Sequence, residues 1–145
     1  MGELSISTPT LRRMHEDWES RRQGRLLPAR RSFDIMDFKY IVGSLNLVDV
    51  ERNPMRFRYR VHGTNCVNIL GYDMTGKYVD DYPDPAYRRR VGENFRGVVE
   101  TRAPRCDIGR RAIVDGRIIR FEALILPLAD DGETVDKLMI ALSLA

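Results

Sequence analysis

Residues 104–144 read PRCDIGRRAIVDGRIIRFEALILPLADDGETVDKLMIALSL, and this stretch decides the fold. Asp115-Gly116 is a strong signal for a tight hairpin turn, and Asp130-Asp131-Gly132 is a second turn signal. In the last run, leucine and isoleucine recur at every second position from 138 to 144, as in a β-strand. The pattern predicts three consecutive strands joined by hairpins: 104–113, 117–128 and 134–144.

Two further strands are predicted earlier in the chain, on either side of a turn at Asn53-Pro54. The first covers 44–51. The second, Arg56–His62, alternates strictly, with Phe57, Tyr59 and Val61 on one side and basic residues on the other. We therefore expect a hairpin with one apolar face.

Helices are predicted before and between these strands. Thr8-Pro9 is a helix start and Gly24 a helix stop, which gives an amphipathic helix over 9–22. Further helices are predicted at 33–41 (short, capped by Ser32), at 65–70 (stopped by Gly71) and at 85–99 (long). Strands and helices do not alternate regularly, so the sheet is expected to be antiparallel and the fold class α+β.

The charge is unevenly distributed along the 145 residues. Residues 1–32 hold seven Arg and four acidic residues, whereas residues 33–145 hold 17 of each sign. We therefore divide the chain into an N-terminal helix with a basic connector, residues 1–32, and a body, residues 33–145. No signal peptide or apolar segment long enough to span a bilayer is found, so we expect a cytoplasmic protein without membrane insertion.

The middle of the chain resembles PAS sensor domains. Asn65, the run Ile69-Leu70-Gly71-Tyr72 and Gly76-Lys77 are similar to the central PAS pattern. More narrowly, residues 10–142 resemble a group of bacterial single-domain PAS-like proteins. The similar pieces are Trp18, Leu27-Pro28-Ala29, Phe57-Arg58-Tyr59-Arg60, Gly63-Thr64, Leu126-Pro127-Leu128, Asp131-Gly132 and Val135-Asp136.

The resemblance implies a five-stranded antiparallel sheet in the order 2-1-5-4-3, with helices on one face and an extra N-terminal helix. It also implies a cavity for a small molecule and a regulatory role without catalysis. Such domains often dimerise through the helix before the first strand, which is 9–22 here. Leu11, Met14 and Trp18 on that helix are therefore the candidate partner-binding residues, for a second copy or another protein.

No cofactor, metal or catalytic residue is assigned. Flavin-binding relatives use an Asn-Cys pair, but in a later register than Asn65-Cys66, so we expect no flavin. His15 and His62 are not on the long helix that faces the cavity, so we expect no haem. Two Cys and two His are too scattered for a zinc site. Neither the serines nor Cys66 has the neighbours of a nucleophile.

The candidate ligand pocket lies between the sheet and the helices. Tyr59 is its candidate on the sheet, and Asn65, Ile69 and Phe95 are its candidates on the helices. Arg120 or Glu122 on the fourth strand is expected to orient a polar ligand.

The sequence thus predicts a sensory or regulatory protein that acts through a ligand, protein contact or both. Two alternatives remain. The arginine-rich segments could bind nucleic acid or another anion, although we favour their pairing with neighbouring acidic residues. The chain could also be a small NTF2-like enzyme of α+β fold, for which two histidines offer little.

Overall fold

The computed structural model describes residues 4–112 and 116–144, and it confirms the predicted order of elements. The helices are α1 (Pro9–Arg21), α2 (Thr64–Leu70) and α3 (Pro85–Thr101). The strands are β1 (Leu45–Glu51), β2 (Arg56–His62), β3 (Arg105–Ala112), β4 (Ile118–Leu128) and β5 (Lys137–Leu144). Ile113, the predicted end of the third strand, and Asp115 of the predicted Asp115-Gly116 turn lie outside the described residues, whereas Gly116 has a φ of +87°.

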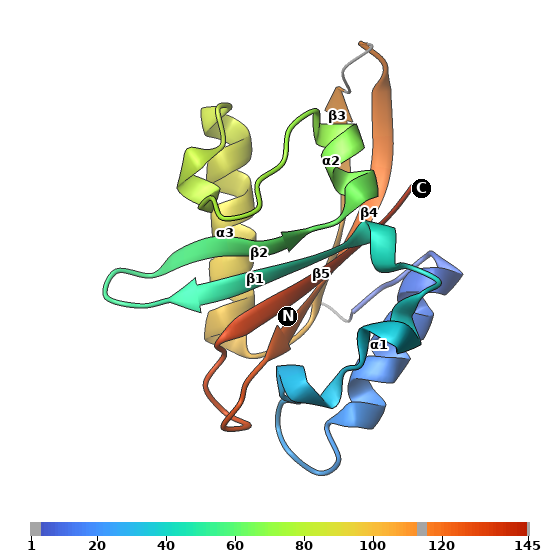
Figure 1. Cartoon of the computed structure of the whole chain (residues 1–145), viewed down its shortest axis with the longest axis vertical. Helices are drawn as coiled ribbons and strands as arrows, with labels where there is room; N and C mark the ends of the chain where they lie inside the picture. The colour runs from blue at the N-terminus through green and yellow to red at the C-terminus, as the bar shows by residue number, and fades with distance from the viewer. Residues whose placement is uncertain (1–3, 113–115, 145) are drawn as a thin grey trace.

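The five strands form one antiparallel sheet in the order β2-β1-β5-β4-β3, as predicted (Figure 1). The last strand lies in the middle because β5 pairs with both β1 and β4. The two hairpins therefore meet only when the C-terminal strand is in place. Both edge strands, β2 and β3, lead into or out of the helical middle of the chain.

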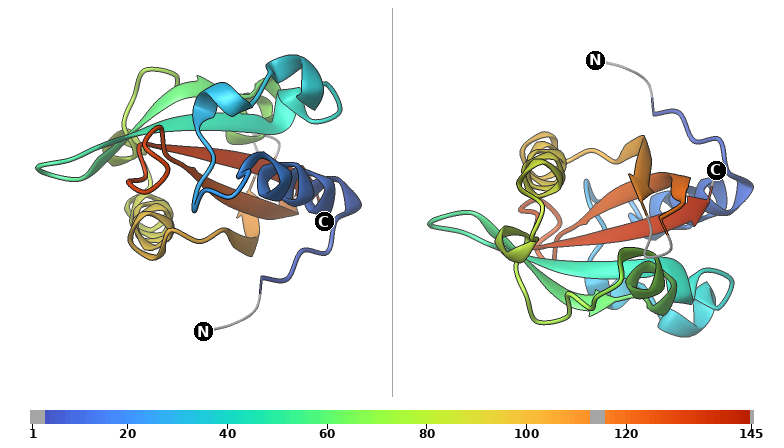
Figure 2. Two further views of the ribbon diagram at one scale, coloured as in Figure 1. Left: turned by 90° about the horizontal axis from the view of Figure 1, so that it is seen from below. Right: turned by 90° about the horizontal axis from the view of Figure 1, so that it is seen from above.

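Helices cover both faces of this sheet. Along β4, Phe121, Ala123 and Ile125 point toward the side of α2 and α3. The intervening Leu124 and Leu126 are fully buried on the opposite side. That side is covered by α1, which contacts β4 and β5 (Figures 1 and 2). The two-sided burial explains why β4 has apolar residues in both registers.

Helix α1 belongs to the core of the protein. Leu11 and Met14 are fully buried, Trp18 is 2% exposed, and the Trp18 Nε1–H donates to the carbonyl oxygen of Pro127 at 2.9 Å. These three side chains are buried within the chain in this structure, and their role in binding a partner stays a prediction. The narrow apolar face of α1 is the face that packs on the sheet.

The basic connector is held against the turn between β4 and β5. The Leu27 N–H donates to the Gly132 carbonyl, and the Ala129 N–H donates to the Pro28 carbonyl. Leu27 and Ala29 are fully buried and share one core with the body of the protein. As a domain boundary, the division at residue 32 stays a prediction.

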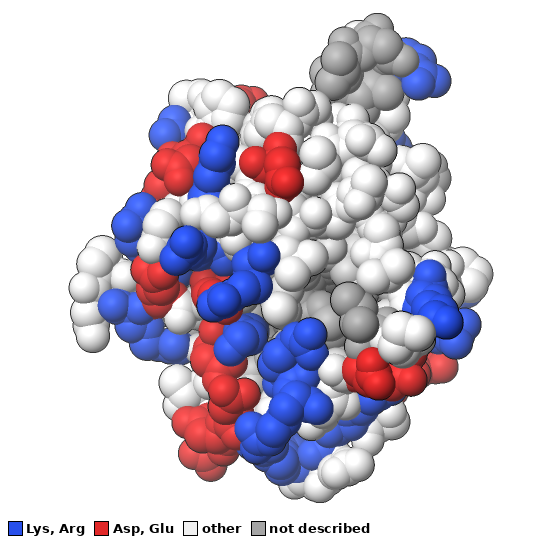
Figure 3. Space-filling view, viewed as in Figure 1, with Lys and Arg blue, Asp and Glu red and all other residues white. Residues whose placement is uncertain are grey.

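The N-terminal arginines contact the protein itself. Arg21 pairs with Asp37 at 3.1 Å, Arg22 with Glu19 at 2.9 Å, and the Arg13 guanidinium stacks on Tyr40. Basic and acidic side chains also lie next to each other along the left and lower parts of the face shown in Figure 3. All seven arginines of this region make intramolecular contacts: Arg12, Arg13, Arg21, Arg22, Arg25, Arg30 and Arg31.

The short helix predicted over 33–41 is instead a series of 3-10 turns: Arg30–Ser32, Ile35–Phe38 and Val42–Ser44. The predicted cap, Ser32, lies inside the first turn. Asp34 is the cap, because its side chain accepts from the Met36 N–H at 3.0 Å. Phe38 and Ile41 are buried among the core residues, so tertiary packing shapes this segment more than helix propensity does.

A β-bulge in β2 changes the predicted faces of this strand. Leu47 pairs with Val61 but Val48 pairs with Tyr59, which leaves Arg60 as the extra residue. Alternation is therefore interrupted after Tyr59. Val61 is 44% exposed rather than buried, and the His62 side chain is 3% exposed rather than on a polar surface. The bulge turns His62 toward the helices.

Candidate functional site

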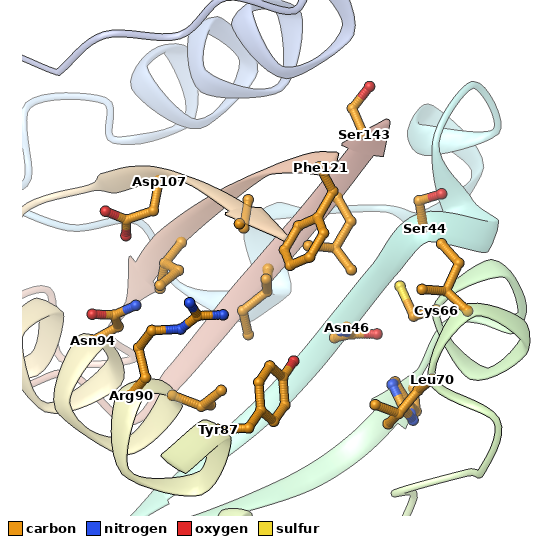
Figure 4. A pocket seen from close by; sticks show the side chains of 18 of the residues that line it. Ser44, Asn46, Cys66, Leu70, Tyr87, Arg90, Asn94, Asp107, Phe121 and Ser143 are labelled. Atoms are coloured by element: carbon orange, nitrogen blue, oxygen red, sulfur yellow. The ribbon is translucent and has the colours of Figure 1, made fainter. Parts of the chain in front are cut away.

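A cavity of about 430 Å³ lies between the sheet and the helices α2 and α3 (Figure 4). Its floor is formed by residues of β1, β3, β4 and β5, and its walls by α2, α3 and residues of β2. The lining combines aromatic and aliphatic side chains with polar ones, which include three asparagines, His62, Arg90, Arg105 and Asp107. A cavity of this size and composition is typical of a small-molecule site.

Helix α3 supplies one wall through residues spaced three and four positions apart. Tyr87, Arg90, Val91, Asn94 and Phe95 all line the cavity. Such residues fall on one face of a helix. The Asp84 side chain caps this helix by accepting from the Ala86 N–H, and Pro85 stands at its first position.

Gly109 on β3 allows the ring of Phe121 on β4 to pack against the β3 backbone at the floor of the cavity. A Cβ atom at this position would lie 2.5 Å from the ring of Phe121, its partner on β4. The ring of Phe121 therefore lies directly over the backbone of β3. This contact places Phe121 at the cavity, where Figure 4 shows it above the floor.

Two tyrosine hydroxyls meet at the inner end of the cavity. The Oη atoms of Tyr59 and Tyr82 are 2.7 Å apart, and the two rings pack edge to face. Both side chains are 3% exposed. Burial raises the pKa of Tyr59 and that of Tyr82 far above the ordinary value, so both hydroxyls stay protonated.

His62 lies beside this pair, with its ring centroid 5.2 Å from that of Tyr59. Its Nδ1 accepts a hydrogen bond from the Met74 N–H at 2.9 Å. Burial lowers the pKa of His62 and outweighs the opposing effect of Asp73, 3.7 Å away. The imidazole is therefore neutral at pH 7.

Asn46 and Cys66 complete the inner end. The Asn46 Oδ1 accepts from the Gly63 N–H at 2.9 Å, which fixes the start of α2 against β1. Burial raises the pKa of the Cys66 thiol to about 11, although a hydrogen bond with Asn46 opposes this. Cys66 is thus a thiol rather than a reactive thiolate at neutral pH.

Charged groups lie on the α3 and β3 sides of the cavity. The Arg90 guanidinium is 5.8 Å from the Tyr87 ring, and Figure 4 shows it directed across the cavity near Asn94. Arg105 pairs with Asp107 at 2.6 Å on β3. Arg90 and Arg105 are both exposed, so this is the polar, solvated part of the site.

Four of the six predicted pocket residues line the cavity: Tyr59, Asn65, Ile69 and Phe95. Arg120 and Glu122 do not, and this part of the prediction is wrong. They alternate with Phe121 and Ala123 along β4 and therefore point to the opposite face of the sheet. The sequence also missed Asn46, His62, Tyr82, Tyr87 and Arg90.

Glu122 instead holds the N-terminal segment. Its carboxylate accepts hydrogen bonds from the Ser7 N–H at 2.7 Å, the Thr8 N–H at 2.9 Å and the Thr8 hydroxyl. Burial tends to raise the pKa of Glu122, but these hydrogen bonds outweigh it and lower the pKa below its ordinary value. Glu122 is thus a charged structural residue.

Within the described residues, no helix is long and apolar enough to span a bilayer. No group of three His, Cys, Asp or Glu side chains suitable for a metal ion is present among those residues. Cys66 and Cys106 are both free thiols.

Solved structures share this fold at low sequence identity. A structure of VqmA bound to DPO is 16% identical, with a TM-score of 0.62, and the match covers 77% of this chain and 55% of that one. The LOV protein of Rhodobacter sphaeroides is 11% identical, with a TM-score of 0.53, covering 77% of this chain and 68% of that one. The chain thus spans about half of VqmA. At these identities the likeness concerns the fold alone.

No functionally curated protein matches the chain in sequence. The model of one protein family, described as the PAS domain, does match it, over residues 6–143. That range includes α1, the strands β1 to β4 and all of β5 except Leu144. The match identifies a PAS domain, and not the NTF2-like fold that was the alternative from the sequence. The chain therefore belongs to the PAS domain family.

Proposed function

We propose that this chain is a sensory or regulatory PAS domain that binds one small molecule in the cavity and acts through contact with another protein. The observation that carries the proposal is the cavity of about 430 Å³, which combines an apolar lining with polar groups at both ends. Helices α2 and α3 form two of its walls.

The fold neighbours support a sensory role by analogy. VqmA is described as bound to DPO and, for Vibrio cholera, as part of a complex with ligand and DNA. We do not extend DNA binding to this chain, because its N-terminal arginines contact the protein's own surface. The output proposed here is a protein contact, made by a homodimer or with another protein.

A role without catalysis is supported by the chemistry of the cavity. Its inner end holds neutral tyrosines, a neutral histidine and a thiol whose pKa is raised to about 11. Nucleophilic catalysis by Cys66 would require a thiolate, whereas its raised pKa keeps the thiol protonated at neutral pH. The expectation that neither flavin nor haem binds stays a prediction, and a visible absorption spectrum of the purified protein checks it.

A melting screen against a small-molecule library tests binding. A ligand present at 100 times its dissociation constant should stabilise the folded protein by about 2.7 kcal/mol. The variant Ala123→Phe fills the cavity from β4, and it should lose the stabilisation by every compound that acts on the wild type. The variant Ala86→Phe adds the same ring at an exposed position of α3 and should keep it. Binding unaffected by Ala123→Phe would place the ligand elsewhere.

A further inference from the structure

The tyrosine pair at the inner end has one more proton than its hydrogen bond uses. Two hydroxyl groups carry two protons, and the bond between Tyr59 and Tyr82 uses one. Among the described residues, the hydroxyls of Tyr59 and Tyr82 make this hydrogen bond and no other. Since buried polar groups in folded proteins are generally hydrogen-bonded, the remaining proton calls for an acceptor that the described part of the protein does not supply.

His62 presents a second donor at the same place. Because Nδ1 accepts from the Met74 N–H, the proton of the neutral ring is on Nε2. The side chain is 3% exposed and lines the cavity. Within the described part of the chain, Nε2 has no hydrogen-bond partner. The tyrosine pair and the neighbouring His62 thus each offer one hydrogen-bond donor that the described residues do not use.

Among the described residues, the inner end carries no cation that could balance an anionic ligand. Tyr59, Tyr82 and His62 are all kept neutral by burial. Of the residues that the structure describes, the arginines that line the cavity are Arg90 on α3 and Arg105 on β3, and both are exposed. A carboxylate placed at the inner end would therefore lose its hydration without gaining a cation, which is costly.

We propose that the ligand of this cavity carries an uncharged hydrogen-bond acceptor, such as a carbonyl oxygen, at the end that lies against Tyr59, Tyr82 and His62. The inference rests on the proposed function, since it describes the ligand of the same cavity. A purely apolar ligand would leave the donors unsatisfied, and a charged one would be buried without a counter-ion.

Three planar probes of the same skeleton test the polarity directly. They are 2-acetylnaphthalene, which has a neutral acceptor, 2-isopropenylnaphthalene, which has none, and 2-naphthoate, which is charged. Their dissociation constants are measured by isothermal titration calorimetry on the whole chain at pH 7.5. We expect the acetyl probe to bind at least about tenfold more tightly than either of the others, as one or two hydrogen bonds would give.

Variants then assign the preference to the tyrosine pair. Removing one hydroxyl leaves the other with a free proton, so Tyr59→Phe and Tyr82→Phe should each keep most of the preference. The double variant removes the donor and should reduce the preference to about threefold or less, with His62 still present. Tyr72→Phe is the control, because Tyr72 packs against the ring of Tyr82 without lining the cavity.

Each outcome decides between the two proposals. Equal affinity for the three probes, or tightest binding of the naphthoate, overturns the neutral-acceptor inference. If Ala123→Phe also abolishes that binding, the proposed function stands. Failure of all three probes to bind the wild type contradicts the proposed function, and the inference fails with it. The comparison of probes on the wild type holds even if the double variant does not fold.

Discussion

Glu122 is a buried carboxylate whose partners all come from the N-terminal segment. It is 2% exposed and accepts from Ser7 and Thr8. Across the sheet surface, burial and then the charge of Glu122 raise the pKa of Cys106 to about 12. The carboxylate therefore joins β3, β4 and the start of α1 in one polar cluster.

We predict that Glu122→Ala lowers the free energy of unfolding by about 1–3 kcal/mol, because two backbone N–H groups and a hydroxyl lose their acceptor. The change is measured by urea denaturation. Glu133→Ala is the control, since Glu133 is an exposed acid in the turn before β5. Equal effects of the two substitutions would contradict a structural role for Glu122.

The lowered pKa of Glu122 also gives a pH dependence. A group whose pKa is lower in the folded state contributes stability above its unfolded pKa and loses it as the pH falls through the folded value. The wild type should therefore lose more stability than Glu122→Gln between pH 5 and about pH 3. Parallel stability curves for the two proteins would show that Glu122 titrates normally.

The pKa of His62 should lie below the ordinary value, whereas an acidic partner would raise the pKa of an exposed histidine. Its pKa is lowered by burial, so protonation opposes folding, and stability should decrease as the pH falls below about 6.5. Nitrogen-15 NMR should show the proton on Nε2 at pH 7.5 and a titration midpoint below 6.5. A proton on Nδ1, or a raised pKa, would contradict the hydrogen bond from Met74.

At the scale of elements, the junction between β2 and α2 is the tightest backbone contact near the cavity. A Cβ atom at Gly63 would lie 2.6 Å from the Gly43 carbonyl oxygen and 2.7 Å from that of Leu45. The Gly63 N–H also binds Asn46. Glycine is thus required here by the close approach of three backbone segments.

A pair of glycine substitutions tests this junction. Gly63→Ala should destabilise the protein by several kcal/mol, since backbone atoms must move. Gly97→Ala, in the middle of α3 and open to space, should stabilise it by about 0.5–1 kcal/mol through helix propensity. Thermal unfolding of both variants measures the difference. A mild effect of Gly63→Ala would mean that the three segments are not held together.

The predictions made from sequence succeeded where the signal is local. The turn residues around β4 and β5, the Gly71 cap at φ +94° and the spacing in α3 each locate an element by themselves. Faces were harder to predict, because they depend on pairing. The bulge at Arg60 leaves no pattern in β2, so the inward turn of His62 could not be seen.

The error at Glu122 has a similar cause. Both faces of β4 are covered, one by α1 and the other by α3, so apolar residues occur in both registers and alternation does not identify the cavity side. Tyr82 and Tyr87 were missed because they belong to the turn and helix start after β2, where aromatic residues are expected for packing alone.

At the scale of the whole molecule, α1 completes a second layer on the sheet. We predict that Leu11→Ala lowers the free energy of unfolding by about 2–5 kcal/mol, as for a fully buried leucine. Glu16→Ala, on the exposed side of α1, should have little effect. Chemical denaturation measures both. A small effect of Leu11→Ala would show that α1 is free to leave the sheet and to bind a partner.

The central claim is that the cavity between the sheet, α2 and α3 holds one small molecule. Native mass spectrometry, at low activation energy, of the wild type and Ala123→Phe tests it most directly, in the absence and presence of a stabilising compound from the screen. We predict one bound molecule per wild-type chain and none on Ala123→Phe. A bare chain mass for the wild type under both conditions, or equal binding to the two proteins, would contradict the claim.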